Sequence, residues 1–186
     1  MANHKDTTGE ASSGWWTRNC AQLGTFLRVL FGFIWVLDGV MKFAYLVPSD
    51  VPVLVQGAGQ GQPDWLVPWF NFWSGLVSAD PSLFLYGIGA LELAVGIFLV
   101  VGLMRKTIYV GGIALSLMIW AVDEGFGGPY GPGATDVGAA VMYAVVFFAL
   151  MVVDAYGGWN RYSLDAIIER HIRSWRKLAE IGEKSF

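Results

Sequence analysis

Four long apolar stretches constrain this chain more than any other feature, and none of them contains a proline. They cover residues 23–46, 83–103, 107–122 and 137–155. Each approaches the roughly 20 helical residues that cross the hydrocarbon layer of a bilayer. A backbone in lipid must satisfy its own hydrogen bonds, so these stretches are predicted to be transmembrane helices. Residues 104–106 leave room only for a tight turn, which predicts an antiparallel hairpin within a four-helix bundle.

Composition agrees with an all-α membrane protein. Of the 186 residues, 55% are hydrophobic and 15% are charged, whereas a soluble domain carries about 25% charged residues. We expect a polar N-terminal tail at 1–18, the membrane domain at 19–158 and a basic C-terminal helix at 159–186. A single cysteine, Cys20, excludes an internal disulfide and a thiolate metal cage. The net charge of -3 gives no reason to expect a nucleic-acid partner.

The basic residues predict the orientation. Lys5 and Arg18 precede the first stretch, Arg105 and Lys106 lie between the second and third, and six more follow the fourth. The connections 47–82 and 123–136 contain acidic residues but no Lys or Arg. Basic loops stay on the cytoplasmic side of a membrane. The alternation therefore predicts a multi-pass protein of the cell membrane with both termini in the cytoplasm.

Two further helices are predicted outside the spans. The segment Asp64–Val77 begins with a capping residue and repeats tryptophan at helical spacing, so it fits an interfacial helix or a lid over a quinone-sized cavity. The segment Ser163–Leu178 has an apolar stripe beside basic residues. It fits an amphipathic helix that binds anionic headgroups or docks on a cytosolic partner. The Gly- and Pro-rich connection 123–136 predicts a compact cap, with Thr135 or Asp136 capping the fourth helix.

Ionisable side chains within spans are the first functional candidates, because they are costly in lipid. We single out Arg28, Asp38, Lys42 and Glu92. Arg28, one turn from its helix start, fits snorkelling or, with Arg105, a structural or anion-contact role on the cytoplasmic side. Asp38 and Lys42 are four residues apart and can pair on one helix face. Glu92 has no acid or base within one turn of its own helix.

Asp38 and Glu92 are predicted to lie at nearly equal depth. Asp38 is eight residues from the outer end at Leu46, and Glu92 is nine from the outer start at Leu83. In a packed bundle they can line an outward-facing polar cavity. Other residues predicted to reach this cavity are Lys42, Trp120, Asp123, Asp136 and Tyr143.

Such a cavity fits a quinone headgroup as substrate, which takes up two protons on reduction. We assign Asp38 and Glu92 to proton transfer and Lys42 to orientation of the headgroup. A hydrogen-bonded brace between helices is the structural alternative. The chain has no HExxH, CxxC, GxGxxG or P-loop motif, so neither a metal nor a nucleotide is expected.

Nearly the whole chain, from about Arg18 to Trp175, resembles the DoxX/DoxD group of small four-helix membrane proteins. The first helix carries the resemblance with Arg28, Gly32, Asp38-Gly39 and Lys42-Phe43, and the second with Glu92. The segments GGPYGPGATDVGAAVMYAVVFFAL and RYSLD are similar to the DoxD branch.

The DoxD resemblance implies the membrane subunit of a thiosulfate:quinone oxidoreductase that works with a DoxA-like partner subunit. The wider group also implies an alternative, a non-catalytic scaffold or maturation factor for a redox partner, as in the similar MauE proteins. A small transporter is a third possibility. The acidic outer loops would repel a thiosulfate dianion, so a partner or the cytoplasmic side would have to bind it. Gly32, Gly39, Gly89 and Gly96 permit close helix contacts within a subunit or in a homo-oligomer.

Overall fold

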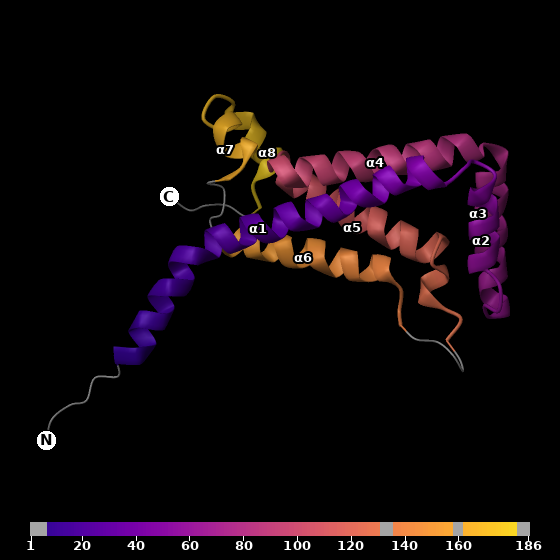
Figure 1. Ribbon diagram of the computed structural model, residues 1–186, viewed down its shortest axis with the longest axis horizontal. Coiled ribbons are helices and arrows are strands. Elements are labelled where there is room, and N and C mark those ends of the chain that lie inside the picture. The colour runs from indigo at the N-terminus through magenta and orange to yellow at the C-terminus, as the bar shows by residue number, and fades with distance from the viewer. Residues whose placement is uncertain (1–6, 131–135, 158–161, 182–186) are drawn as a thin grey trace, which may run out of the picture.

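The computed structural model describes residues 7–130, 136–157 and 162–181, and the regular structure in these ranges is helical. Three helices are long and apolar enough to cross a membrane: residues Gln22–Tyr45 of α1 (Thr7–Tyr45), α4 (Pro81–Val101) and α5 (Arg105–Val122). The fourth apolar stretch forms the shorter helix α6 (Ala139–Gly157). These helices run along one long axis, and α1 continues beyond the others toward its N-terminus (Figure 1).

Helices α1 and α4 approach so closely that glycine is required between them. A Cβ atom at Gly96 would lie 2.6 Å from the Val36 nitrogen and 2.8 Å from the Gly32 carbonyl oxygen. A Cβ at Gly39 would lie 3.0 Å from the Gly89 carbonyl oxygen. These small residues therefore form a contact within the chain, one of the two arrangements that the sequence permits.

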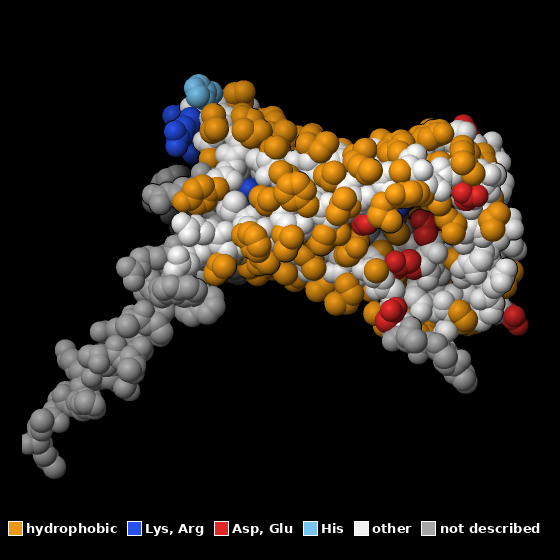
Figure 2. Space-filling view, in the orientation of Figure 1, with side chains coloured by type: hydrophobic (Ala, Val, Ile, Leu, Met, Phe, Trp, Pro, Cys, Tyr) orange, Lys and Arg blue, Asp and Glu red, His pale blue; other side chains and the backbone are white. Residues whose placement is uncertain are grey.

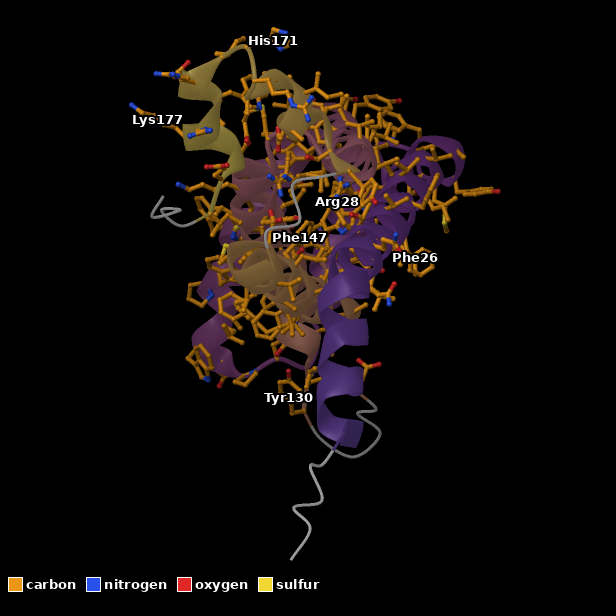
Figure 3. All side chains as sticks on the ribbon, turned by 90° about the vertical axis from the view of Figure 1, so that its left-hand side faces the viewer. Phe26, Arg28, Tyr130, Phe147, His171 and Lys177 are labelled. Atoms are coloured by element: carbon orange, nitrogen blue, oxygen red, sulfur yellow. The ribbon has the colours of Figure 1, made fainter. Side chains whose placement is uncertain are left out.

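Aromatic rings fill the centre of the bundle between α1, α5 and α6. Phe31 and Trp35 of α1 meet Phe147 of α6, with ring centroids 4.8 Å and 5.3 Å from the Phe147 ring. Phe147 is fully buried and points into this core (Figure 3). Gly112 of α5 makes room for it, since a Cβ there would lie 2.3 Å from the ring. The core thus joins α6 firmly to the three longer apolar helices.

Two helices lie across one end of the bundle, α2 (Asp50–Ala58) and α3 (Val67–Ala79), with the 3-10 turn η1 (Asp64–Leu66) before α3 (Figure 1). The sequence pattern predicts α3 but not α2, because α2 is short and has a proline in its first turn. Trp69 Nε1 donates to the Ala121 carbonyl oxygen at 3.0 Å. Val55 and Val77 are buried together with Val122. Helices α2 and α3 therefore cap this end of the bundle.

The opposite end carries the C-terminal segment, and here the prediction of one continuous amphipathic helix is wrong. The segment forms α7 (Leu164–Ile168), the 3-10 turn η4 (Arg173–Trp175) and α8 (Arg176–Ala179). Ile172 has extended backbone angles, φ −127° and ψ 97°. The resulting bend brings Trp175 Nε1 to within 2.8 Å of Asp165 Oδ1. A straight helix would separate these groups by almost three turns.

The turn between α4 and α5 covers residues 102–104, two residues before the predicted link 104–106, and it depends on Gly102. Gly102 has φ +69°, and a Cβ there would lie 2.5 Å from Arg28 Nη1. The carboxylate of Asp165 accepts from the backbone nitrogens of Met104 and Arg105 at 2.8 Å and 3.1 Å. An α7 side chain therefore caps the start of α5.

Candidate functional site

An ion pair joins α1 to α4 in the half of the bundle nearer to α2 and α3. Lys42 Nζ donates to Glu92 Oε1 at 2.8 Å, with the Glu92 side chain 2% exposed and that of Lys42 24% exposed. The close approach of Gly39 and Gly89 holds the two helices at the distance that this pair needs. Glu92 Oε2 is buried, with no hydrogen-bond partner among the described residues. One carboxylate oxygen is thus free to accept a proton or a donor.

Asp38 does not take Lys42 as its hydrogen-bond partner, contrary to the pairing expected from their spacing. Its carboxylate interacts electrostatically with the Tyr143 hydroxyl of α6. Asp38 also interacts electrostatically with Glu92 and with Lys42. The long Lys42 side chain reaches across to α4 because the Glu92 carboxylate is more deeply buried than that of Asp38, and leaving it unpaired would cost more free energy. Asp38, Lys42, Glu92 and Tyr143 therefore form one polar cluster.

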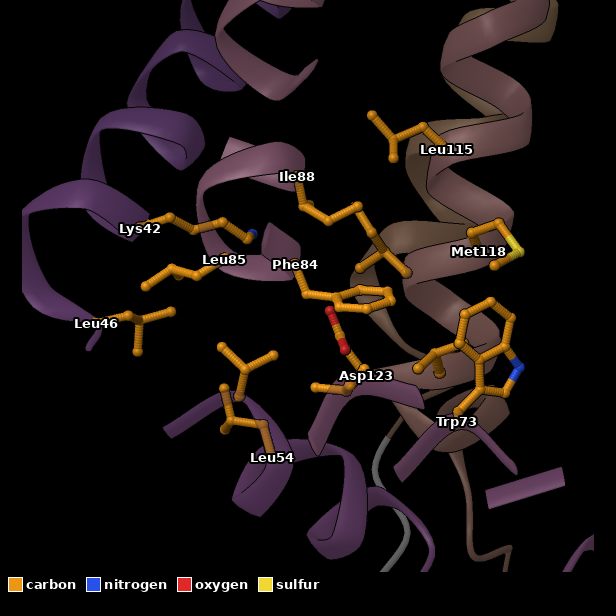
Figure 4. A pocket seen from close by; sticks show the side chains of 14 residues that line it. Lys42, Leu46, Leu54, Trp73, Phe84, Leu85, Ile88, Leu115, Met118 and Asp123 are labelled. Atoms are coloured by element: carbon orange, nitrogen blue, oxygen red, sulfur yellow. The ribbon is translucent and has the colours of Figure 1, made fainter. Parts of the chain in front are cut away.

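A pocket of about 90 Å³ opens beside this cluster, between the bundle and the α2–α3 cap (Figure 4). Among the described residues that line it, the charged ones are Lys42 on one wall and Asp123 on another. The remaining walls are apolar and come from four helices, α2 to α5, and from Leu46 just after α1: Leu46, Val51, Leu54, Trp73, Val77, Phe84, Leu85, Ile88, Leu115, Met118, Ile119 and Val122. An apolar pocket with two opposed polar groups suits a flat apolar molecule with polar ends.

Asp123 follows the last residue of α5 at the rim of the pocket. Apolar groups packed around it raise the pKa of its carboxyl group, although part of the side chain stays exposed. The Lys42 ammonium lowers this pKa, and Glu124 raises it further. Asp123 can therefore hold a proton at a higher pH than a solvated aspartate can.

The remaining candidates at the pocket end of the bundle do not line the pocket. Trp120 Nε1 donates to the Val137 carbonyl oxygen at 2.7 Å. Glu124 accepts from the Ala140 nitrogen at 3.0 Å and so caps α6, the role predicted for Thr135 or Asp136. Asp136 is exposed and accepts from the Gly138 nitrogen at 2.8 Å. Thr135 lies outside the described residues. These contacts position the start of α6.

At the opposite end, Arg28 and Arg105 are buried and bound to protein groups. Arg28 donates to the carbonyl oxygens of Leu99 and, at 2.8 Å, of Tyr162. Arg105 Nη1 lies 2.5 Å and 2.6 Å from the two carboxylate oxygens of Asp154, and its Nε lies 3.1 Å from Asp165 Oδ2. The geometry gives both arginines structural contacts.

Sequence reasoning missed both acidic partners of Arg105. Asp154 lies in the last turns of the fourth apolar stretch, and an ionisable residue in a span is a signal that could have found it. Asp165 is fully buried, yet in sequence it looks like an ordinary acidic residue in the first turn of a surface helix. Its burial follows from the packing of α7 on the turn between α4 and α5, which the sequence alone does not reveal.

No family model, curated protein sequence or solved structure matches this chain. The roles of its residues therefore rest on geometry and on the chemistry of the side chains. In the ranges that the structure describes, no three His, Cys, Asp or Glu side chains are grouped as metal ligands. The arrangement that can do chemistry is the pocket with Lys42, the buried Glu92 behind it, and Asp123 opposite.

Proposed function

We propose that this chain is the membrane subunit of a quinone-linked oxidoreductase and that the pocket holds the quinone headgroup. The observation that carries the proposal is the apolar pocket with the Lys42 ammonium on one wall and the Asp123 carboxyl group on another. A quinone is a flat apolar ring with a carbonyl oxygen at each end. It would place one carbonyl against a donor on each side, while the apolar walls contact the ring.

The side chains of the pocket would supply protons. A lysine ammonium has three N–H groups, and Lys42 gives one to Glu92. Another can donate to a quinone carbonyl oxygen, while Glu92 holds the ammonium in position. Asp123 at the rim can pass protons from water to the second carbonyl. Asp38 and Tyr143, farther from the pocket, are the next groups in line to replace a proton given up by Lys42.

The electrons would come from thiosulfate, the donor that the DoxD resemblance implies. Two thiosulfate ions that join through a new S–S bond release two electrons, and these with two protons convert the quinone to a quinol. The pocket end of this chain carries several exposed acidic side chains, as Figure 2 shows. Their field would repel a dianion. A DoxA-like partner subunit would therefore bind the thiosulfate.

We further propose that α6 crosses the membrane as a fourth span. Its 19 residues have a length of about 28 Å, close to the hydrocarbon thickness of a bilayer. It packs along α5 and shares the aromatic core through Phe147. Four spans in the cell membrane, oriented by the basic residues, would place both termini in the cytoplasm.

The proposal can be tested with two adjacent residues of α2. Leu54 lines the pocket, whereas Val53 is 66% exposed and is not among the lining residues. Leu54→Trp would fill the pocket and weaken photo-crosslinking to an azido-quinone by at least about tenfold in nanodiscs. Val53→Trp, the matched control, would leave the crosslink unchanged. Equal crosslinking of the two variants and the unchanged protein would contradict a pocket site.

Catalysis is tested separately in the complex with its partner subunit. Glu92→Gln and Asp38→Asn are expected to slow thiosulfate-dependent quinone reduction while the complex remains assembled. Unchanged rates in both variants would contradict the proton-transfer role of this cluster.

A second candidate is a non-catalytic scaffold for a redox partner. The α2–α3 cap favours it, because its outer surface exposes large apolar side chains such as Val53, Trp65 and Phe72. These could bind a partner domain outside the membrane. In that case Phe72→Ser would release the partner, and the isolated complex would show no quinone reduction.

A further inference from the structure

The C-terminal segment presents a basic surface at the end of the bundle opposite α2 and α3 (Figures 1 and 2). The side chains of Arg170, Arg173 and Lys177 are exposed. Two acidic side chains of the same segment point inward: Asp165 is fully buried, and Glu169 is 8% exposed. The fold therefore separates the charges of a nearly balanced sequence and turns the positive ones outward.

Apolar side chains lie among these cations. Ile167, Ile172 and Leu178 are 56%, 49% and 38% exposed. Figure 3 shows His171 and Lys177 extending away from the bundle at this end. Helices α4 and α5, both long enough to cross a membrane, meet next to this segment at Gly102. The surface consequently lies at the level where a bilayer changes from acyl chains to headgroups.

The surface is held in place by the protein itself. Asp165 binds the start of α5 and Trp175, and its backbone nitrogen donates to the Gly102 carbonyl oxygen at 3.1 Å. Thr107 Oγ1 donates to the Leu178 carbonyl oxygen at 3.2 Å, and Ala179 is fully buried. These contacts hold the backbone that carries the basic residues, so a ligand does not have to order this segment.

We propose that this surface binds anionic phospholipid headgroups and anchors the end of the bundle to the membrane. Arg170, Arg173 and Lys177 would contact lipid phosphates, and the exposed isoleucines would enter the upper acyl region. The mixture of apolar and basic side chains beside the spans distinguishes a lipid from an acidic protein. Binding to a protein in the aqueous phase would not explain why Ile167 and Ile172 are exposed at the level of the bilayer surface.

The test uses the full chain in nanodiscs of phosphatidylcholine alone or with one quarter phosphatidylglycerol. Amide hydrogen exchange over residues 162–181 is expected to be at least about fivefold slower with the anionic lipid. This factor corresponds to the attraction of a single basic side chain to an anionic membrane surface. The α2–α3 cap at the other end is the internal control and should exchange equally in both lipids. High salt should remove the difference.

Variants separate charge from fold. Arg170→Gln with Arg173→Gln and Lys177→Gln should abolish the lipid effect, whereas Arg170→Lys with Arg173→Lys should retain it. Asp64→Asn, an exposed charge change in the α2–α3 cap, should leave the effect unchanged. Equal exchange of the unchanged protein in both lipids, or an effect that survives the triple substitution, overturns the proposal. Slowing by an added acidic polypeptide but not by anionic lipid overturns it in favour of a protein partner.

Discussion

Glu92 sits in the bundle with one carboxylate oxygen 2.8 Å from the Lys42 ammonium and the other without a partner among the described residues. A carboxylate 2% exposed cannot stay charged unless a cation or hydrogen bonds compensate for lost water. Lys42 does this from a partly exposed position. Without the pair, the buried Glu92 carboxylate would lose more compensation for its desolvation than the partly exposed Lys42 ammonium would.

Lys42→Met is expected to destabilise the protein by about 3 kcal/mol, because it leaves the buried carboxylate unpaired. Adding Glu92→Gln should recover part of this loss, since the amide is neutral. The free energy of unfolding in detergent for both single variants and the double variant measures the coupling. Additive losses would contradict a direct pair.

Asp165 connects three parts of the chain through one carboxylate. It accepts from the backbone nitrogens of Met104 and Arg105, from Arg105 Nε and from Trp175 Nε1. Its loss would leave Arg105 with Asp154 alone. The C-terminal segment depends on this residue for its place on the bundle.

Asp165→Ala should therefore loosen the C-terminal segment while the membrane helices remain folded. We expect tryptic cleavage after Arg170 and Arg173 to become at least about tenfold faster. The reason is that removing a buried, hydrogen-bonded carboxylate favours local opening of the segment. Asp136→Ala, at an exposed residue of the opposite end, is the control. Equal cleavage rates for the two variants would show that Asp165 does not anchor the segment.

At the scale of elements, the packing of α1 on α4 positions the Lys42–Glu92 pair. The backbone of α4 approaches α1 at Gly96 and Gly89, where a side chain would collide with α1. Other glycines of the same helix are free of this constraint, as at Gly87, where a Cβ would meet nothing within 4 Å. Gly96 and Gly87 of α4 therefore form a matched pair, one at the contact with α1 and one away from it.

Gly96→Ala should destabilise the protein by about 1–3 kcal/mol through overpacking, despite the higher helix propensity of alanine. Gly87→Ala should be neutral or slightly stabilising for the same propensity reason. Thermal unfolding in one detergent compares the two directly. If Gly96→Ala unfolds at the temperature of Gly87→Ala, α1 and α4 are not in close contact.

The whole molecule has charges of opposite sign at its two ends, with the acidic pocket rim at one and the basic C-terminal surface at the other (Figure 2). For the proposed four-span bundle, the positive-inside rule predicts that the basic end faces the cytoplasm. The pocket would open outward and the basic surface would face the anionic inner leaflet. The proposed fourth span is the element on which this arrangement depends.

Cysteine labelling tests this topology in a Cys20→Ser background. With four spans, a membrane-impermeant maleimide should label Asp64→Cys in intact cells but label Lys106→Cys and Ser174→Cys only after permeabilisation. With α6 on one side of the membrane, Ser174→Cys would react like Asp64→Cys. All three side chains are exposed in the structure, so a missing signal reports sidedness.

Hydropathy and the absence of internal proline were enough to locate the apolar helices within about two residues at most ends, because each helix satisfies its own backbone in lipid. They also identified Glu92 and Lys42 as residues that need an explanation in an apolar segment. These are local properties, and a single sequence contains them.

The choice of partners was decided by the tertiary structure. Lys42 pairs with Glu92 on another helix because the glycine contact sets how far α1 lies from α4. Asp38 interacts instead with Tyr143, which the packing of α6 brings to α1. Helix α2 and the bend at Ile172 depend in the same way on distant groups, the bundle end and Asp165. Spacing along one helix cannot predict which neighbour a long side chain reaches once three-dimensional packing supplies a better one.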